Sequence, residues 1–243
     1  MARIPRRPED IFPEVIEAFQ QAFGQDLLSV VLYGSGAGGD YIPGKSDLNF
    51  LVVLTGRGIN ELGRAITAVK RLKKYPVDTP LLMTKTFIGA SLDAYPLEFL
   101  DMKRNHVLVF GEDVLSELVI DAHNLRLQCE RELKAKVLHL RRGFIDGRGR
   151  ARALRELIGV SLPAFIAIFK GLLYLKGVPV PQGRREIIRT VSEALAFDPA
   201  AFLQCADIRE GMGRFSDSEI QAVFQAYLRA AERLCEQIDG LKY

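Results

Sequence analysis

Two apolar runs that enclose a glycine-rich loop constrain this sequence most. Residues 27–34 read LLSVVLYG and residues 46–56 read SDLNFLVVLTG. Short runs of this kind, rich in branched residues and closed by glycine, are typical of buried strands. The loop between them, residues 34–46, reads GSGAGGDYIPGKS. It contains three overlapping patterns that are associated with phosphate binding, and they require different structures around them.

Two of the three patterns need a helix immediately after the loop. Residues 34–39 fit the dinucleotide pattern G-x-G-x-x-G, and residues 39–46 fit the P-loop pattern G-x-x-x-x-G-K-S. In both, the phosphates bind at the N-terminus of the helix that follows. Pro43 and Gly44 interrupt any helix after the first pattern, and the strand-like run DLNFLVVL follows the second. We therefore interpret both as accidental matches.

The third pattern needs a strand on each side of the loop, as this sequence has. Gly34 and Ser35 close the first strand, and Asp47 and Asn49 lie two residues apart on the second, so their side chains share one face. The segment resembles the polymerase-beta-type nucleotidyltransferase superfamily, whose signature is G-S, a spacer, and then D-x-D or D-x-E on the next strand. The helical second half resembles the C-terminal bundle of kanamycin-nucleotidyltransferase-like proteins. Motif-level similarity is limited to residues 30–54.

The resemblance implies transfer of a nucleoside monophosphate from an NTP to an acceptor hydroxyl or amine. In such enzymes carboxylates hold two Mg²⁺ ions beside the triphosphate. By this resemblance Gly34 and Ser35 would bind phosphate and Asp47 would be the first metal ligand. Lys85, with Lys103 and Arg104 as alternatives, could reach a phosphate from the strand side.

The third carboxylate should come from a neighbouring strand. Residues 96–103, PLEFLDMK, are predicted to form that strand, and they offer Glu98 and Asp101 on opposite faces. Glu98 is preferred as a catalytic and metal-binding residue because an acid inside an apolar run needs a reason to be there. Asp101 remains the alternative.

Asn49 departs from the family pattern, which has a carboxylate at this position. An amide oxygen can bind a cation but carries no charge, so the site would hold two negative charges instead of three. We therefore expect one Mg²⁺ ion more readily than two, and weakened or lost transfer. Two alternatives follow: an inactive nucleotide-binding protein, or a protein-interaction module such as one partner of a two-component pair.

The remaining sequence predicts an α+β fold, with a nucleotidyltransferase-like mixed sheet and flanking helices followed by an all-α bundle. Helical periodicity marks residues 8–24 and 59–75, and further strands are expected at residues 80–87 and 106–111. After residue 112 no segment resembles a strand, and long amphipathic helices follow, starting near Leu115. Ser216 and Glu219 form a capping box that opens the last helix. The predicted domains are residues 1–112 and 113–243.

Composition gives weak indications about partners and location. With 33 basic and 30 acidic residues the net charge is +3, which does not demand a nucleic acid or an acidic membrane. Arg184, Arg185 and Arg189 are interpreted as a solvated helix face. Three widely spaced cysteines indicate reduced packing residues in a cytoplasmic protein. The apolar residues 157–169 are too few for a membrane span, and the long apolar stripes of the bundle could pack within the chain or form a homodimer.

Overall fold

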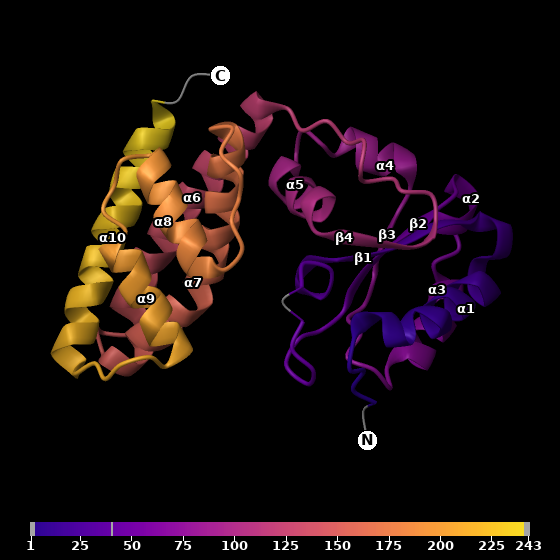
Figure 1. Ribbon diagram of the computed structural model, residues 1–243, viewed down its shortest axis with the longest axis horizontal. Helices are drawn as coiled ribbons and strands as arrows, with labels where there is room; N and C mark the ends of the chain where they lie inside the picture. Colours follow the sequence, from indigo (N-terminus) through magenta and orange to yellow (C-terminus); the bar gives the residue numbers. More distant parts are fainter. Residues whose placement is uncertain (1–2, 40, 241–243) are drawn as a thin grey trace. The chain divides into compact units, whose positions relative to one another are not determined.

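The computed structural model describes residues 3–39 and 41–240, which divide into two compact units. Unit 1 contains the residues up to Asp93 together with Glu98–Ile120. Unit 2 contains Ala94–Leu97 together with the residues from Asp121 onward. The two units are drawn in indigo to magenta and in magenta to yellow, respectively (Figure 1). The predicted division into domains at residue 112 stays a prediction.

Unit 1 is built on a mixed sheet of four strands in the order β3-β2-β1-β4. The strands are β1 (Leu27–Tyr33), β2 (Asn49–Leu54), β3 (Leu81–Met83) and β4 (His106–Gly111). β1 is antiparallel to both β2 and β4, and β2 is parallel to β3. At one end of the sheet Tyr33 pairs with Asn49 on one side and with His106 on the other. The strands predicted within residues 27–34, 46–56 and 106–111 are confirmed as β1, β2 and β4.

One face of the sheet carries the main core of unit 1. Helices α1 (Phe12–Phe23) and α3 (Gly63–Leu72) cover that face, and α4 (Lys85–Ala90) and α5 (Pro96–Arg104) lie on the other side of the sheet (Figure 1). Alternate strand residues point into this core, because side chains of a strand alternate between its faces. The core includes Val15, Phe19, Val30, Leu32, Leu48, Phe50, Val52, Ala68 and Leu72. Short helical segments complete the unit: 3₁₀ turns at Pro8–Ile11, Gly24–Asp26 and Gly34–Gly36, and α2 (Gly56–Ile59).

A buried carboxylate ties the start of β1 to the end of β2. Asp26 is 3% exposed and accepts hydrogen bonds from Thr55 Oγ1 at 2.6 Å and from Arg57 Nε at 3.0 Å. Arg57 Nη2 adds an ion pair at 2.9 Å. The Thr55 hydroxyl also caps α2 by accepting from the Gly58 N–H. Because the charge is paired and several donors satisfy its oxygens, the carboxylate can stay buried.

The prediction of a strand at residues 96–103 is wrong, because these residues form helix α5. Pro96 occupies the first helical position, where its missing N–H costs nothing. Glu98 lies in the first turn, and Lys103 and Arg104 in the last, so the charges complement the helix dipole. Leu97 and Leu100 are both buried at i, i+3 spacing, which suits a helix.

Two other boundaries differ from the predictions because a side chain caps a helix. The strand expected over residues 80–87 ends at Met83, since Thr84 accepts a hydrogen bond from the Phe87 N–H at 3.0 Å and begins α4. The first long helix begins at Ala122, not near Leu115, since Asp121 accepts from the Asn124 N–H at 2.8 Å.

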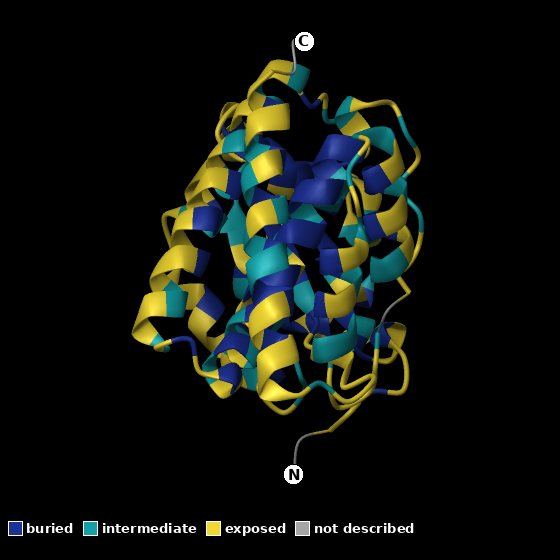
Figure 2. Ribbon diagram, turned by 90° about the vertical axis from the view of Figure 1, so that its left-hand side faces the viewer, coloured by how far each residue is buried: buried dark blue, intermediate teal, exposed yellow. Residues whose placement is uncertain are grey.

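Unit 2 is an all-helical bundle. Its helices are α6 (Ala122–Asp146), α7 (Ala151–Leu175), α8 (Arg184–Ala194), α9 (Ala200–Glu210) and α10 (Asp217–Asp239). They carry buried residues along some faces and exposed residues along others (Figure 2). The predicted capping box is confirmed, because the Ser216 N–H donates to Glu219 Oε2 at 2.7 Å and the Glu219 N–H donates to Ser216 Oγ at 3.3 Å. Buried aromatic rings join the helices, among them Phe165, Phe169, Phe202 and Tyr227.

Among the described helices, α7 is the one that is long and apolar enough to cross a membrane by length and composition. An 18-residue window in it has a mean hydropathy of 1.9, which meets the length and composition of a membrane span. Half of that window is buried inside the protein. Because its buried residues pack in the bundle together with α6, α8, α9 and α10, we interpret α7 as the central core helix of unit 2.

Two glycines of α7 should respond to the same substitution in opposite directions. A Cβ at Gly171 would lie 2.7 Å from Leu97 Cδ1 and 2.9 Å from Cys129 Sγ, whereas a Cβ at Gly159 would meet nothing within 4 Å. Gly159→Ala should raise the free energy of unfolding by about 0.5–1 kcal/mol because alanine favours a helix. Gly171→Ala should lower it by about 1 kcal/mol because the core is overpacked. Urea unfolding followed by circular dichroism measures both, and stabilisation by Gly171→Ala would contradict the close packing.

The buried Asp26 should make stability depend on pH. Hydrogen bonds from Arg57 and then Thr55 hold the pKa of Asp26 below its ordinary value. A lowered folded-state pKa stabilises the protein above about pH 4, and this contribution is lost as the pH falls through the folded pKa. Asp26→Asn should therefore lower the urea midpoint at pH 7, and the difference from the natural protein should shrink in acid. A difference that stays constant down to about pH 2 would contradict this assignment.

Candidate active site

The turn after β1 is held in a fixed conformation that requires glycine. Gly34 has φ +74°, in the left-handed region that side chains disfavour. Its N–H donates to the Asn105 carbonyl at 3.3 Å, and its own carbonyl accepts from the N–H groups of Ala37 and Gly38 at 3.0 Å. Ser35 is exposed, and its hydroxyl makes no hydrogen bond within the described residues. The turn therefore presents, on an anchored backbone, a hydroxyl that has no hydrogen-bond partner among residues 3–39 and 41–240.

Asp47 and Asn49 lie beside this turn. Their burial alternates with that of their neighbours: Asp47 is exposed and Asn49 is half-buried, whereas Leu48 and Phe50 are buried in the core. Both side chains therefore point to the face opposite the α1–α3 core. Asp47 precedes β2, which begins at Asn49. A Cβ on Gly34 would lie 3.6 Å from Asn49 Nδ2, so the strand residue packs directly against the glycine turn.

A second carboxylate, which the sequence analysis missed, lies next to this pair. The Leu48 N–H donates to the Pro76 carbonyl at 2.7 Å, and the Asp78 N–H donates to the Leu48 carbonyl at 3.1 Å. Asp78 is exposed, and its charge acts on the phenol of Tyr33, the cross-strand partner of Asn49. Burial and then this charge raise the pKa of Tyr33. In the sequence, the only indication of Asp78 is its position two residues before Pro80, which precedes the edge strand β3.

The two predicted candidates for the third carboxylate lie on α5 and not on a strand. Asp101 Oδ1 accepts from Asn105 Nδ2 at 3.2 Å, and Asn105 in turn holds the Gly34 N–H through its carbonyl. Glu98 is exposed, and it lies almost one helical turn further from Asn105 along the chain than Asp101 does. The structure therefore brings Asp101 into hydrogen-bond connection with the glycine turn through Asn105.

Lys85 lies at the other end of the sheet. Val53 pairs with Met83, so α4 and Lys85 begin at least about 13 Å along the strand from Asn49. The Lys85 ammonium forms an ion pair with Glu112. Of the two alternatives, Lys103 donates to the Leu118 carbonyl at 2.7 Å. The structure thus does not bring Lys85 together with Gly34 and Ser35.

A histidine flanks the site on the β4 side. The Nδ1 atom of His106 lies 3.0 Å from the Lys103 carbonyl, and Nε2 lies 3.2 Å from the Asp113 carboxylate. Burial acts to raise the pKa of Asp113, but hydrogen bonds from His106 and from the N–H groups of Leu115 and Ser116 together outweigh burial and lower this pKa. His106 is therefore a hydrogen-bonded residue at the border of the site.

The oxygen donors beside the turn suit one hard cation. Carboxylate and amide oxygens are the groups that Mg²⁺ takes as ligands, and Asp47, Asn49 and Asp78 offer them on neighbouring chain segments. Within residues 3–39 and 41–240, no cluster of three or more acidic, histidine or cysteine side chains has the arrangement of a metal site. Two close divalent ions would need more negative charge than this donor set carries.

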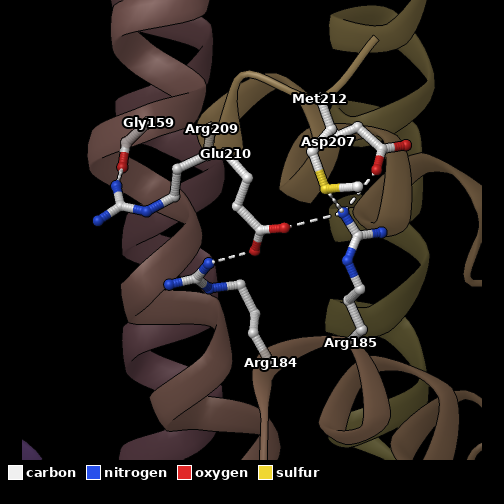
Figure 3. A network of polar contacts seen from close by, with 7 residues as sticks. All are labelled: Gly159, Arg184, Arg185, Asp207, Arg209, Glu210 and Met212. Carbon is white, nitrogen blue, oxygen red and sulfur yellow. Dashed lines mark hydrogen bonds and ion pairs between the residues drawn. The ribbon is translucent and has the colours of Figure 1, made fainter. Parts of the chain in front are cut away.

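The basic start of α8 is occupied by ion pairs (Figure 3). Arg184 Nη1 lies 2.7 Å from Glu210, and Arg185 Nη2 lies 2.6 Å from Asp207 and 2.9 Å from Glu210. Arg189 pairs with Glu186. Since α9 supplies Asp207 and Glu210, the network holds α8 against α9. Because these arginines are paired with acids, they leave little positive charge for binding nucleic acid.

The comparison with solved structures supports the fold. No protein-family model matches the chain, and no curated protein matches it by sequence. Among solved structures, it is similar to the crystal structure of spectinomycin adenyltransferase AAD(9) from Enterococcus faecialis with ATP and spectinomycin. The similarity covers 95% of this chain and 98% of that chain, with a TM-score of 0.52 and 12% sequence identity. The predicted resemblance is confirmed at the level of architecture: the chain has the nucleotidyltransferase fold, a mixed α+β sheet unit followed by a helical bundle.

Proposed function

We propose that this chain binds a magnesium nucleoside triphosphate at the Gly34–Ser35 turn and transfers its nucleoside monophosphate weakly or not at all. The observation that carries the proposal is the contact between the turn and the strand: Gly34 packs on Asn49, and Asp47 lies two residues away on the same face. The exposed hydroxyl of Ser35 at this turn suits a phosphate oxygen. ATP is bound in the similar spectinomycin adenyltransferase structure.

The proposed binding site uses the residues that the structure brings together. The Ser35 hydroxyl donates a hydrogen bond to a phosphate oxygen. Asp47 and Asn49 supply oxygen ligands to a single Mg²⁺ ion, and Asp78 adds a second negative charge nearby. When bound, such an ion neutralises phosphate charge and orients the triphosphate. Asn105 and Asp101 hold the turn in place through the Gly34 N–H. Glu98 and Lys85 lie further from this arrangement and contribute less to the proposal.

The neutral side chain at position 49 is the reason to expect weak transfer. Asn49 contacts Tyr33 and Gly34 and carries no charge itself, so among the described residues Asp47 and Asp78 supply two negative charges where the family pattern has three. A metal clamp contributes several kcal/mol to the transition state, and each 1.36 kcal/mol corresponds to about a factor of ten in rate. Binding without transfer is the alternative outcome, and a purely protein-binding role is a second one. Cytoplasmic location and a homodimer through the bundle stay predictions.

Nucleotide binding should depend on Asp47. Isothermal titration calorimetry of the natural protein with ATP and GTP should show binding that is strengthened by Mg²⁺. Asp47→Asn should weaken binding in Mg²⁺ by about tenfold or more, because one charged ligand is lost. In the presence of EDTA the two proteins should bind ATP alike. Asp93→Asn makes the same chemical change on an exposed surface of unit 1 and should leave both affinities unchanged. Absence of binding by any nucleotide would leave only the protein-interaction role.

Restoring the carboxylate at position 49 should restore transfer. We expect Asn49→Asp to raise the rate of nucleoside monophosphate transfer by about 100-fold, because added charge allows a second ion to be compensated. Labelled ATP and GTP, Mg²⁺ and a panel of hydroxyl acceptors that includes spectinomycin provide the assay, with pyrophosphate release as a second readout. Asn49→Ala serves as the matched control and should not gain activity. Robust turnover by the natural protein, unchanged in Asn49→Asp, would overturn the proposal of weak transfer.

A further inference from the structure

An apolar groove runs along the free edge of the sheet in unit 1. β3 is the edge strand on this side, with β2 as its neighbour in the sheet. The groove has a volume of about 270 Å³ and lies between β3 and α3. It is lined by Ala65, Ile66, Val69, Lys70 and Lys73 from α3, and by Thr79, Pro80 and Leu82 from the edge. An edge strand offers unpaired backbone N–H and C=O groups to another extended chain.

Large apolar side chains are exposed beside this groove. Ile66 is 56% exposed, Leu62 is 52% exposed and Leu81 is 37% exposed. Leu62 immediately precedes α3 and lies four residues before Ile66, so the two side chains are on the same side of this helix. Leu82 points from β3 toward the α1–α3 core, whereas Leu81 points to the other face of the sheet. An extended segment added to β3 would contact apolar side chains on both of its faces.

The positive charges at this groove are not compensated. α3 and the residue pair after it carry five cations, and three of them pair with acids: Arg64 with Glu61, Arg71 with Glu17 and Lys74 with Glu14. The remaining two are Lys70 and Lys73, which both line the groove. Both ammonium groups are exposed and make no hydrogen bond or ion pair within the described residues. Charge at the groove is therefore available to an acidic partner.

We propose that this groove binds an extended segment of an acidic protein partner, which adds a strand to the edge of the sheet beside β3. Backbone hydrogen bonds to the edge supply affinity, and alternate side chains supply specificity in this mode of recognition. Apolar residues of the segment would enter the groove against Ile66 and Val69. Carboxylates at alternate positions would pair with Lys70 and Lys73.

Two other occupants fit the observations less well. An anionic membrane would be attracted by the lysines and by Leu62, but it makes no use of the strand edge. A second copy of the chain would bring two lysine-bearing edges together, and like charges would oppose that pairing. Lysines on an edge strand can also prevent the edges of two sheets from pairing. The experiment therefore separates recognition of a partner from prevention of self-association.

The probe is a fluorescein-labelled, capped heptapeptide that alternates glutamate and valine. Its fluorescence anisotropy should rise on addition of the full chain, and amide signals of Leu81–Met83 should shift in NMR spectra of the ¹⁵N-labelled protein. Lys70→Glu/Lys73→Glu should weaken binding by about tenfold, as two favourable pairs become repulsive. Lys45→Glu/Lys176→Glu makes the same change at two exposed lysines outside the groove and should leave the affinity unchanged.

Each contrary result has a distinct meaning. If a lysine–valine heptapeptide bound as tightly as the glutamate–valine probe, recognition by charge would be overturned. If a glutamate–valine peptide with a central proline bound as tightly as the probe, strand addition would be overturned. Binding to phosphatidylserine vesicles that Lys70→Glu/Lys73→Glu abolishes, without peptide shifts at β3, would assign the surface to a membrane. Self-association of Lys70→Glu/Lys73→Glu in size-exclusion chromatography, with no peptide binding to the natural protein, would show that the lysines only protect the edge. Nucleotide binding at Gly34 is independent of all these outcomes.

Discussion

The antiparallel pairing of β1 with β2 is the constraint on which the candidate site depends. Because Tyr33 lies opposite Asn49, the turn that ends one strand and the residues that begin the other meet at a single end of the sheet. The two strands are fixed in this register by apolar residues on both faces and by the buried Asp26 network at their other end. A slip by one residue would turn Asn49 and Asp47 into the core, so packing far from the turn determines where the polar side chains point.

The chemistry at this end of the sheet differs from that of a fully charged metal site. Asp47 is exposed, Asp78 approaches on the edge side, and the position between them and the turn is occupied by a neutral amide. The arrangement keeps oxygen donors while lowering the local negative charge. Since phosphate and carboxylates repel one another, a site with less charge needs fewer cations to accept a nucleotide. Binding and catalysis can thus separate in this fold without any change of the backbone.

Much of the fold could be predicted from local pattern, because β1, β2 and the capped helix α10 each carry a strong signal of their own. The strand predicted at residues 96–103 failed because a short apolar run gives the same composition in a buried strand and a buried helix. Pro96 at the first helical position and the i, i+3 spacing of Leu97 and Leu100 were the available signals. Asp78 could not be found from sequence, since only the pairing of Leu48 with Pro76 and Asp78 brings it near Asn49. The position of Lys85 could not be predicted for the same reason, because it depends on the pairing of β3 with β2 and on where β3 ends.

The first turn of α5 has a consequence for synthesis of the chain on the ribosome. Leu97 belongs to unit 2, where its N–H donates to Gln128 Oε1 at 2.8 Å and its side chain lies against Gly171. Both partners are translated later than Leu97, and the second follows it by more than seventy residues. Domains generally fold in the order in which they emerge, yet this buried leucine has to wait through most of α6 and α7. A nascent chain that has just completed unit 1 therefore still exposes this apolar turn, which can associate with other chains until α6 and α7 have emerged.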